Sequence, residues 1–204
     1  MKRLVVLLVL GFAAFSARAD TPAILIFGDS ISAGYGLAHV EQGWVEMLRV
    51  KLKNEGYGYQ VINASVSGET TAGGLARLPR ALALHHPQIV IVELGGNDGL
   101  RALPIDQMRS NLAKMVDLST GMGARVLLLG MRMPPNYGVE FTEKFSSVFV
   151  DVAHDKKAPL VPFVLAGIAL SPDLIQADGM HPNELGQPQV LANVWLGLKP
   201  ILRK

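Results

Sequence analysis

The chain has 204 residues, of which 50% are hydrophobic and 18% charged, with a formal net charge of +2 and no cysteine. This length is typical of one domain with a sizeable core, and the composition excludes a disordered chain, which would have fewer apolar residues and more net charge. The missing cysteine excludes disulfides, thiolate zinc sites, iron–sulfur clusters, a cysteine nucleophile and a lipid-modified N-terminal cysteine.

The N-terminus has the pattern of a cleaved export signal. Two basic residues follow the initiator methionine, an apolar run covers residues 4–15, and an Ala-x-Ala sequence ends at Ala19. The run is shorter than the roughly 20 apolar residues of a membrane-spanning helix. We therefore expect cleavage near Ala19, a mature domain over residues 20–204, no stable membrane anchor, and a periplasmic or secreted protein.

The positive charge belongs to this signal. Three of the 19 basic residues and none of the 17 acidic residues lie in residues 1–19, so the mature chain would carry 16 basic and 17 acidic residues, a net charge of −1. No run of five basic residues remains beyond it. No nucleic-acid partner is therefore expected, since such a partner requires a basic surface.

Short apolar runs alternate with segments whose apolar residues recur at helical spacing. In chain order they predict a strand at 23–27, a helix at 43–54, a strand at 60–63, a helix at 74–84 interrupted by Pro79, a strand at 89–94, a helix at 104–122, a strand at 125–129, a helix at 140–154, a weaker strand at 160–163 and a helix at 185–198. This alternation predicts an α/β fold, a parallel sheet covered by helices on both faces, with functional residues at the carboxyl ends of the strands.

Ser30, directly after the first predicted strand, is the candidate nucleophile. Taken alone, it would be read as the N-cap of a helix. A serine hydroxyl needs a base within hydrogen-bond reach, and His181 can be that base. Asp178, three residues earlier, can accept the other imidazole N–H and so fix the tautomer.

Two further loops offer donors for an oxyanion. Gly68 follows the second predicted strand, and its backbone N–H can approach a substrate closely because it has no side chain. Asn97 follows the third strand and carries an amide donor, and the backbone N–H of Ser30 is a third donor. Taken alone, Gly68 would be an ordinary turn glycine and Asn97 an Asx-turn residue. Together with the candidate nucleophile and base, they favour acyl transfer.

These residues resemble the blocks that name the SGNH (GDSL) hydrolase family, and the resemblance covers essentially the whole mature chain. The segments 27–35, 92–101 and 134–138 are similar to its bacterial periplasmic acyl-CoA thioesterase, lysophospholipase and arylesterase subgroup.

The resemblance implies a flavodoxin-like three-layer α/β/α fold, a serine hydrolase with no cofactor or metal, and a small ester or thioester substrate with an acyl or aryl group. Ser30, Asp178 and His181 would form the catalytic triad. The oxyanion hole would consist of the Ser30 and Gly68 N–H groups and Asn97 Nδ2.

Other segments are candidates for the substrate pocket. Met133, Pro134 and Tyr137 follow the fourth strand, although without the resemblance a packed crossover loop is the preferred explanation. The resemblance favours a mobile loop at residues 70–79, whereas the residues alone fit a plain loop-to-helix junction. Asp29 and Asp98 are expected to brace loops rather than to catalyse.

Two other functions are compatible with parts of the pattern. A carbohydrate O-deacetylase of the same fold would have an exposed aromatic platform for sugars, and a non-catalytic periplasmic acyl-chain carrier would need no triad. The sequence leaves open the ranking of acyl-CoA, lysophospholipid, aryl ester and short-chain ester, and also the oligomeric state.

Overall fold

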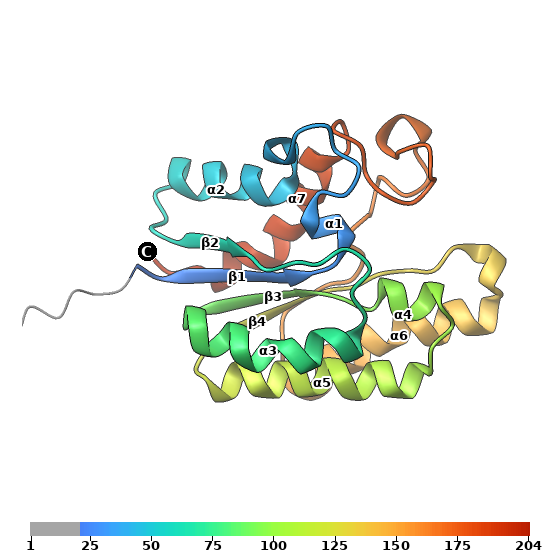
Figure 1. Ribbon diagram of the computed structural model, residues 1–204, viewed down its shortest axis with the longest axis horizontal. Coiled ribbons are helices and arrows are strands. Elements are labelled where there is room, and N and C mark those ends of the chain that lie inside the picture. The colour runs from blue at the N-terminus through green and yellow to red at the C-terminus, as the bar shows by residue number, and fades with distance from the viewer. Residues whose placement is uncertain (1–20) are drawn as a thin grey trace, which may run out of the picture.

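A five-stranded parallel sheet lies at the centre of residues 21–204, the part of the chain that the computed structural model describes (Figure 1). The predicted signal peptide, residues 1–19, lies outside the described residues. The strands follow the spatial order β2-β1-β3-β4-β5, each parallel to its neighbour. This is the flavodoxin-like order, so the predicted fold class is confirmed.

The strands occur where the apolar runs predicted them. They are β1 (Ala23–Gly28), β2 (Gln60–Asn63), β3 (Ile89–Glu93), β4 (Arg125–Leu129) and β5 (Leu160–Val161). All residues of β1 and β3 are buried, as expected for central strands covered on both faces. The last strand is shorter than predicted, because Pro162 has no N–H to continue the ladder.

Helices cover both faces of the sheet. They are α1 (Ser30–Ala33), α2 (Trp44–Asn54), α3 (Thr71–His85), α4 (Gly96–Leu100), α5 (Ile105–Gly121), α6 (Val139–Lys156) and α7 (Gln187–Leu198). Short 3₁₀ turns lie at Val40–Gln42, Pro135–Tyr137, Pro172–Leu174 and Lys199–Ile201. Helices α2 and α7 pack on one face, while α5 lies between α3 and α6 on the other (Figure 1).

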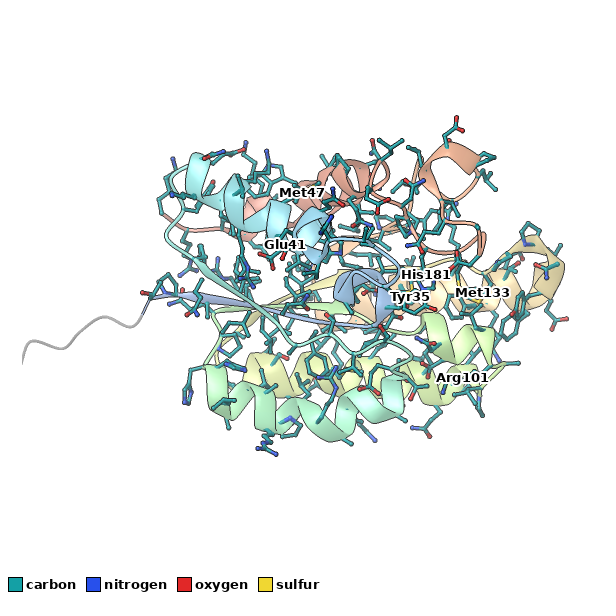
Figure 2. All side chains as sticks on the ribbon, turned by 45° about the horizontal axis from the view of Figure 1, so that its top comes forward. Tyr35, Glu41, Met47, Arg101, Met133 and His181 are labelled. Carbon is teal, nitrogen blue, oxygen red and sulfur yellow. The ribbon has the colours of Figure 1, made fainter. Side chains whose placement is uncertain are left out.

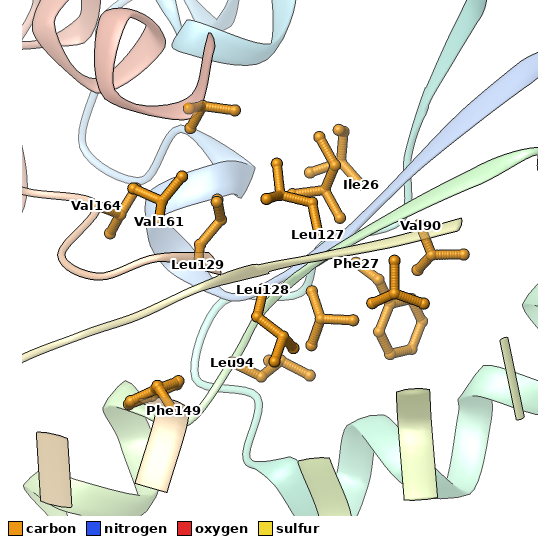
Figure 3. Packing of buried hydrophobic residues seen from close by; sticks show 14 of the residues in the cluster. Ile26, Phe27, Val90, Leu94, Leu127, Leu128, Leu129, Phe149, Val161 and Val164 are labelled. Atoms are coloured by element: carbon orange, nitrogen blue, oxygen red, sulfur yellow. The ribbon is translucent and has the colours of Figure 1, made fainter. Parts of the chain in front are cut away.

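The core consists of side chains that alternate across the sheet (Figure 3). Leu127 points toward α7, where its Cδ atoms lie against Gly197, and Phe27 points toward α3, where its ring lies against Gly74. Consecutive strand residues thus fill opposite layers, which explains why the strands read as unbroken apolar runs. None of the helices in residues 21–204 is long and apolar enough to cross a membrane.

Two helices begin more than one residue away from the predicted position. Helix α3 begins at Thr71 rather than at residue 74, because Thr70 caps it and Asp98 accepts hydrogen bonds from the Thr71 N–H and hydroxyl. Residues 70–79 therefore form a cap and the first half of a helix, and Pro79 lies inside it. Their conformation is that of a loop-to-helix junction, while movement of this segment stays a prediction.

Helix α7 begins at Gln187 rather than at residue 185. The side chain of Asn183 accepts hydrogen bonds from the Leu185 and Gly186 N–H groups, at 3.0 and 3.2 Å, and so holds these two residues in a turn. The helix can start only after that turn.

The sheet has a topological switch point between β1 and β3, since the chain leaves these neighbouring strands toward opposite edges. Loops at the carboxyl ends of such strands leave a crevice between them, where ligands bind in open α/β sheets. Ser30 lies two residues after the end of β1, and Asn97 lies four residues after the end of β3. The fold thus places two predicted site residues at this crevice.

Candidate active site

Ser30, His181 and Asp178 form one hydrogen-bonded chain. Ser30 Oγ lies 2.8 Å from His181 Nε2, and His181 Nδ1 lies 2.6 Å from Asp178 Oδ2. The serine and the histidine are 151 residues apart in sequence, so the fold itself brings them together. The chain has the geometry in which a base activates a hydroxyl nucleophile while a carboxylate orients the base.

The nucleophile turn, residues 28–35, presents Ser30 at the first position of α1. Asp29 caps this helix by accepting a hydrogen bond from the Ile31 N–H at 3.1 Å, and Gly34 ends it in a left-handed conformation with φ of 74°. The residue that caps the helix is therefore Asp29, which leaves the Ser30 hydroxyl free to bond to His181.

The base loop, residues 178–182, is organised around Asp178. Its Oδ1 accepts hydrogen bonds from the N–H groups of Met180 and His181, at 2.9 and 3.0 Å, while its Oδ2 contacts the imidazole. Burial raises the pKa of the Asp178 carboxyl, but the hydrogen bonds from His181 and Met180 outweigh burial and leave this pKa below its ordinary value. Asp178 is thus a carboxylate at neutral pH.

Gln176 connects the base loop to the nucleophile turn, although it belongs to none of the motifs identified in the sequence. Its Nε2 donates to the carbonyl oxygens of Tyr35, at 2.8 Å, and Pro182, at 3.1 Å. Its backbone N–H donates to the His181 carbonyl at 2.8 Å. Gly36, with φ of 75°, leaves the space that the Gln176 side chain occupies, since a Cβ there would overlap it.

Tyr35 lies beside the base. Its ring centroid is 4.7 Å from that of His181, and the two rings are visible side by side in Figure 2. The Tyr35 side chain is 53% exposed, so it forms part of the accessible surface next to His181.

Three hydrogen-bond donors are present in the loops after β1, β2 and β3. The N–H groups of Ser30 and Gly68 make no hydrogen bond to another residue within 21–204. Gly68 has φ of 80°, which favours glycine, and its carbonyl accepts from Arg101 Nη2 at 2.9 Å. Asn97 Nδ2 donates to Asp29 Oδ2 at 3.2 Å, an arrangement that orients the amide.

The two aspartates expected to brace loops do so. Asp29 is 2% exposed and holds Asn97 and the start of α1. Asp98 is 4% exposed and accepts from the Thr71 N–H at 2.8 Å and from the Thr71 hydroxyl at 2.6 Å, which ties α4 to α3.

The predicted pocket residues have different environments. Met133 is buried against Gly99 of α4, while Pro134 is exposed. Tyr137 lines a cavity of about 580 Å³ between the loop after α4 and the start of α6, and its hydroxyl lies 3.4 Å from the Leu100 carbonyl. Met133 and Arg101 lie toward the same end of the molecule as His181 (Figure 2).

The model of the GDSL-like Lipase/Acylhydrolase family matches residues 26–188. This chain belongs to that family. The match spans every strand of the sheet beyond the first residues of β1 and includes the triad. Ser30, Asp178 and His181 all lie within the matched residues.

Relatives in the GDSL family match nearly the whole chain. Esterase TesA of Pseudomonas aeruginosa is 51% identical and covers 91% of this chain and 92% of its own. An arylesterase of Vibrio mimicus is 40% identical, with 90% and 91% coverage. Thioesterase 1/protease 1/lysophospholipase L1 of Escherichia coli is 39% identical, with 92% and 87% coverage.

Solved structures agree with this assignment. The crystal structure of TesA superposes with a TM-score of 0.86 at 51% identity, over 88% of this chain and 99% of that one. AlinE4, an SGNH-hydrolase family esterase, superposes with a TM-score of 0.74 at 37% identity, over 91% and 98% of the two chains.

Proposed function

We propose that this protein is an exported serine hydrolase that cleaves carboxylic ester and thioester bonds through an acyl-enzyme on Ser30. The observation that carries the proposal is the continuous hydrogen-bonded chain from Ser30 through His181 to Asp178. It lies beside the loops whose N–H donors can receive a developing oxyanion.

In the first half of the reaction, Ser30 Oγ attacks the acyl carbonyl and His181 Nε2 takes the hydroxyl proton. The N–H groups of Ser30 and Gly68 and the amide of Asn97 bind the negative charge that forms on the carbonyl oxygen. His181 then gives its proton to the departing alcohol or thiol, and the acyl group stays on Ser30.

In the second half, His181 takes a proton from a water molecule, whose oxygen attacks the acyl-enzyme. The same donors bind the second oxyanion, and collapse releases the carboxylic acid and returns the proton to Ser30. Asp178 remains a carboxylate throughout, which stabilises the imidazolium at both stages.

Acyl or aryl esters and thioesters are the proposed substrates because the relatives are named as an esterase, an arylesterase and a thioesterase/lysophospholipase. An exposed tryptophan platform, which would favour a carbohydrate deacetylase, is lacking, since Trp44 is fully buried and Trp195 only 9% exposed. An acyl-chain carrier would have no need for a serine, a histidine and an aspartate joined by hydrogen bonds.

The N-terminal pattern supports export, with residues 20–204 as one hydrolase domain after cleavage near Ala19. The proposed occupant of the site is a small molecule, with no cofactor, metal, nucleic-acid partner or membrane anchor. Met133, Pro134 and Tyr137 are the proposed contacts of its acyl or aryl group.

A p-nitrophenyl ester series of increasing acyl length, measured beside an acyl thioester and a lysophospholipid, tests the activity. We expect turnover of at least the esters, with kcat lowered by a factor on the order of 10⁶ in the Ser30→Ala variant. An unchanged circular-dichroism spectrum would show that this variant is folded. Full turnover by folded Ser30→Ala would refute the proposed mechanism.

A further inference from the structure

Glu93 is a buried acid in an otherwise apolar strand. It is the last residue of β3, its side chain is 0% exposed, and its neighbours in the strand are isoleucine and valine. Because β3 pairs with β1 up to Gly28, the Glu93 carboxyl lies directly beneath the nucleophile turn. The mechanism above assigns it no role.

One oxygen of Glu93 holds the backbone on both sides of the nucleophile. Oε2 accepts hydrogen bonds from the Asp29 N–H and the Ser32 N–H, each at 3.2 Å, and from the Ser32 hydroxyl at 2.6 Å. Gly28 is required by the same contact, since a Cβ at that position would lie 2.5 Å from Oε2. The carboxyl therefore fixes the residues before and after Ser30.

The surroundings of this carboxyl favour its neutral form. No basic group within residues 21–204 forms an ion pair with it, and its second oxygen, Oε1, is buried without a hydrogen-bond donor among those residues. Burial raises the pKa of Glu93 well above its ordinary value, and the nearby charge of Asp29 raises it further. An ionised carboxylate with an unpaired oxygen would be costly there.

The second carboxyl of the pair is Asp29. Asp29 is also buried, at 2% exposure, and its negative charge disfavours a second charge on Glu93. Asp29 in turn accepts from the Ile31 N–H and from Asn97 Nδ2. Three donors already occupy Glu93 Oε2, so Oε1 is the oxygen left to carry the proton.

We propose that Glu93 is a positioning residue that acts as a neutral carboxylic acid. Its Oε2 fixes the backbone on both sides of Ser30, and Asp29, whose N–H donates to that oxygen, ties the turn to Asn97 through its own side chain. This inference rests on the proposed function, because the placement of Ser30 and Asn97 matters to catalysis only if they are nucleophile and oxyanion donor.

A comparison of the activities of two variants, Glu93→Gln and Glu93→Asp, tests this role. Glutamine keeps the length and the acceptor oxygen but is never charged, whereas aspartate keeps the carboxyl but is one methylene too short to make the same contacts. We expect Glu93→Gln to keep kcat close to that of the unchanged chain. We expect Glu93→Asp to lower kcat by about 10²-fold with little change in KM, as a displaced nucleophile would.

The opposite order, with aspartate active and glutamine inactive or unfolded, would show that the charge matters and would overturn the proposal. Equal activity in both variants would show that Glu93 positions nothing. Glu143→Gln, at an exposed position on α6 away from the cavity beside Tyr137, is the matched control and should behave like the unchanged chain.

Infrared difference spectroscopy gives a readout independent of turnover. Subtracting the spectrum of Glu93→Gln from that of the unchanged chain at neutral pH should reveal the C=O stretching band of a protonated carboxyl. A difference that contains carboxylate bands alone would overturn the proposal. An unchanged chain that hydrolyses no ester would instead refute the proposed function, and the infrared band would still decide the state of Glu93.

Discussion

Asp178 sets the state in which His181 works. It holds the imidazole through Oδ2 and the base-loop backbone through Oδ1, and these hydrogen bonds keep its own pKa low despite burial. A carboxyl with a lowered pKa stabilises the folded state above its ordinary titration range, and this stabilisation is lost as pH falls through the folded value. Asp178 therefore stays ionised through the range in which an imidazole gains its proton.

The low pKa of Asp178 predicts how kcat/KM falls at acid pH. As pH falls, kcat/KM should decrease because the base His181 gains a proton. A plot of log(kcat/KM) against pH should have a slope of about one, because Asp178 stays ionised and adds no second protonation. A pH series of kcat/KM on a p-nitrophenyl ester measures this slope. A slope of two, or a flat profile, would contradict the assignment of a single histidine base.

The triad residues were predictable from sequence because each lies in a short motif after a strand or before the last helix. Glu93 lies outside these motifs because it ends an apolar run, although a charged residue within such a run is itself a signal of a buried polar role. Gln176 has no such signal, since its contacts reach 141 residues along the chain to Tyr35.

At the scale of elements, the site depends on a contact between the nucleophile turn and the base loop. Gln176 makes this contact with three hydrogen bonds, two from its side chain to Tyr35 and Pro182 and one from its backbone to His181. Since these two elements carry the nucleophile and the base, the distance between Ser30 and His181 depends on Gln176.

Gln176→Leu removes the side-chain hydrogen bonds at nearly constant volume. We expect kcat to fall by about 10-fold to 10²-fold while KM changes little, because the Ser30–His181 contact is displaced rather than the substrate. Steady-state kinetics on a p-nitrophenyl ester measures both constants. The control is Gln189→Leu on the exposed side of α7, and identical kinetics in the two variants would show that Gln176 has no positioning role.

The helix boundaries show where local pattern is insufficient. Apolar spacing predicts α3 only from residue 74, yet the hydrogen bonds that Asp98 accepts from Thr71 extend the helix back to that residue. The start of α7 was misplaced because Asn183 holds the preceding turn. Both starts are decided by side-chain contacts that periodicity does not contain.

At the scale of the whole molecule, the sheet was the most predictable feature. Central strands covered on both faces read as continuous apolar runs, so their positions were found to within a residue or two. The order of the strands came from the family resemblance rather than from the runs, because periodicity does not say which strands are neighbours. The cavity beside Tyr137 likewise depends on how the loop after α4 meets α6.

The central claim is that Ser30 is the nucleophile. Intact-protein and peptide mass spectrometry after treatment with a reactive fluorophosphonate tests it most directly, because such a reagent phosphonylates an activated serine. We predict one adduct per chain, located on Ser30, and none in Ser30→Ala. An adduct on another residue, or no adduct in a chain that hydrolyses esters, would contradict the account.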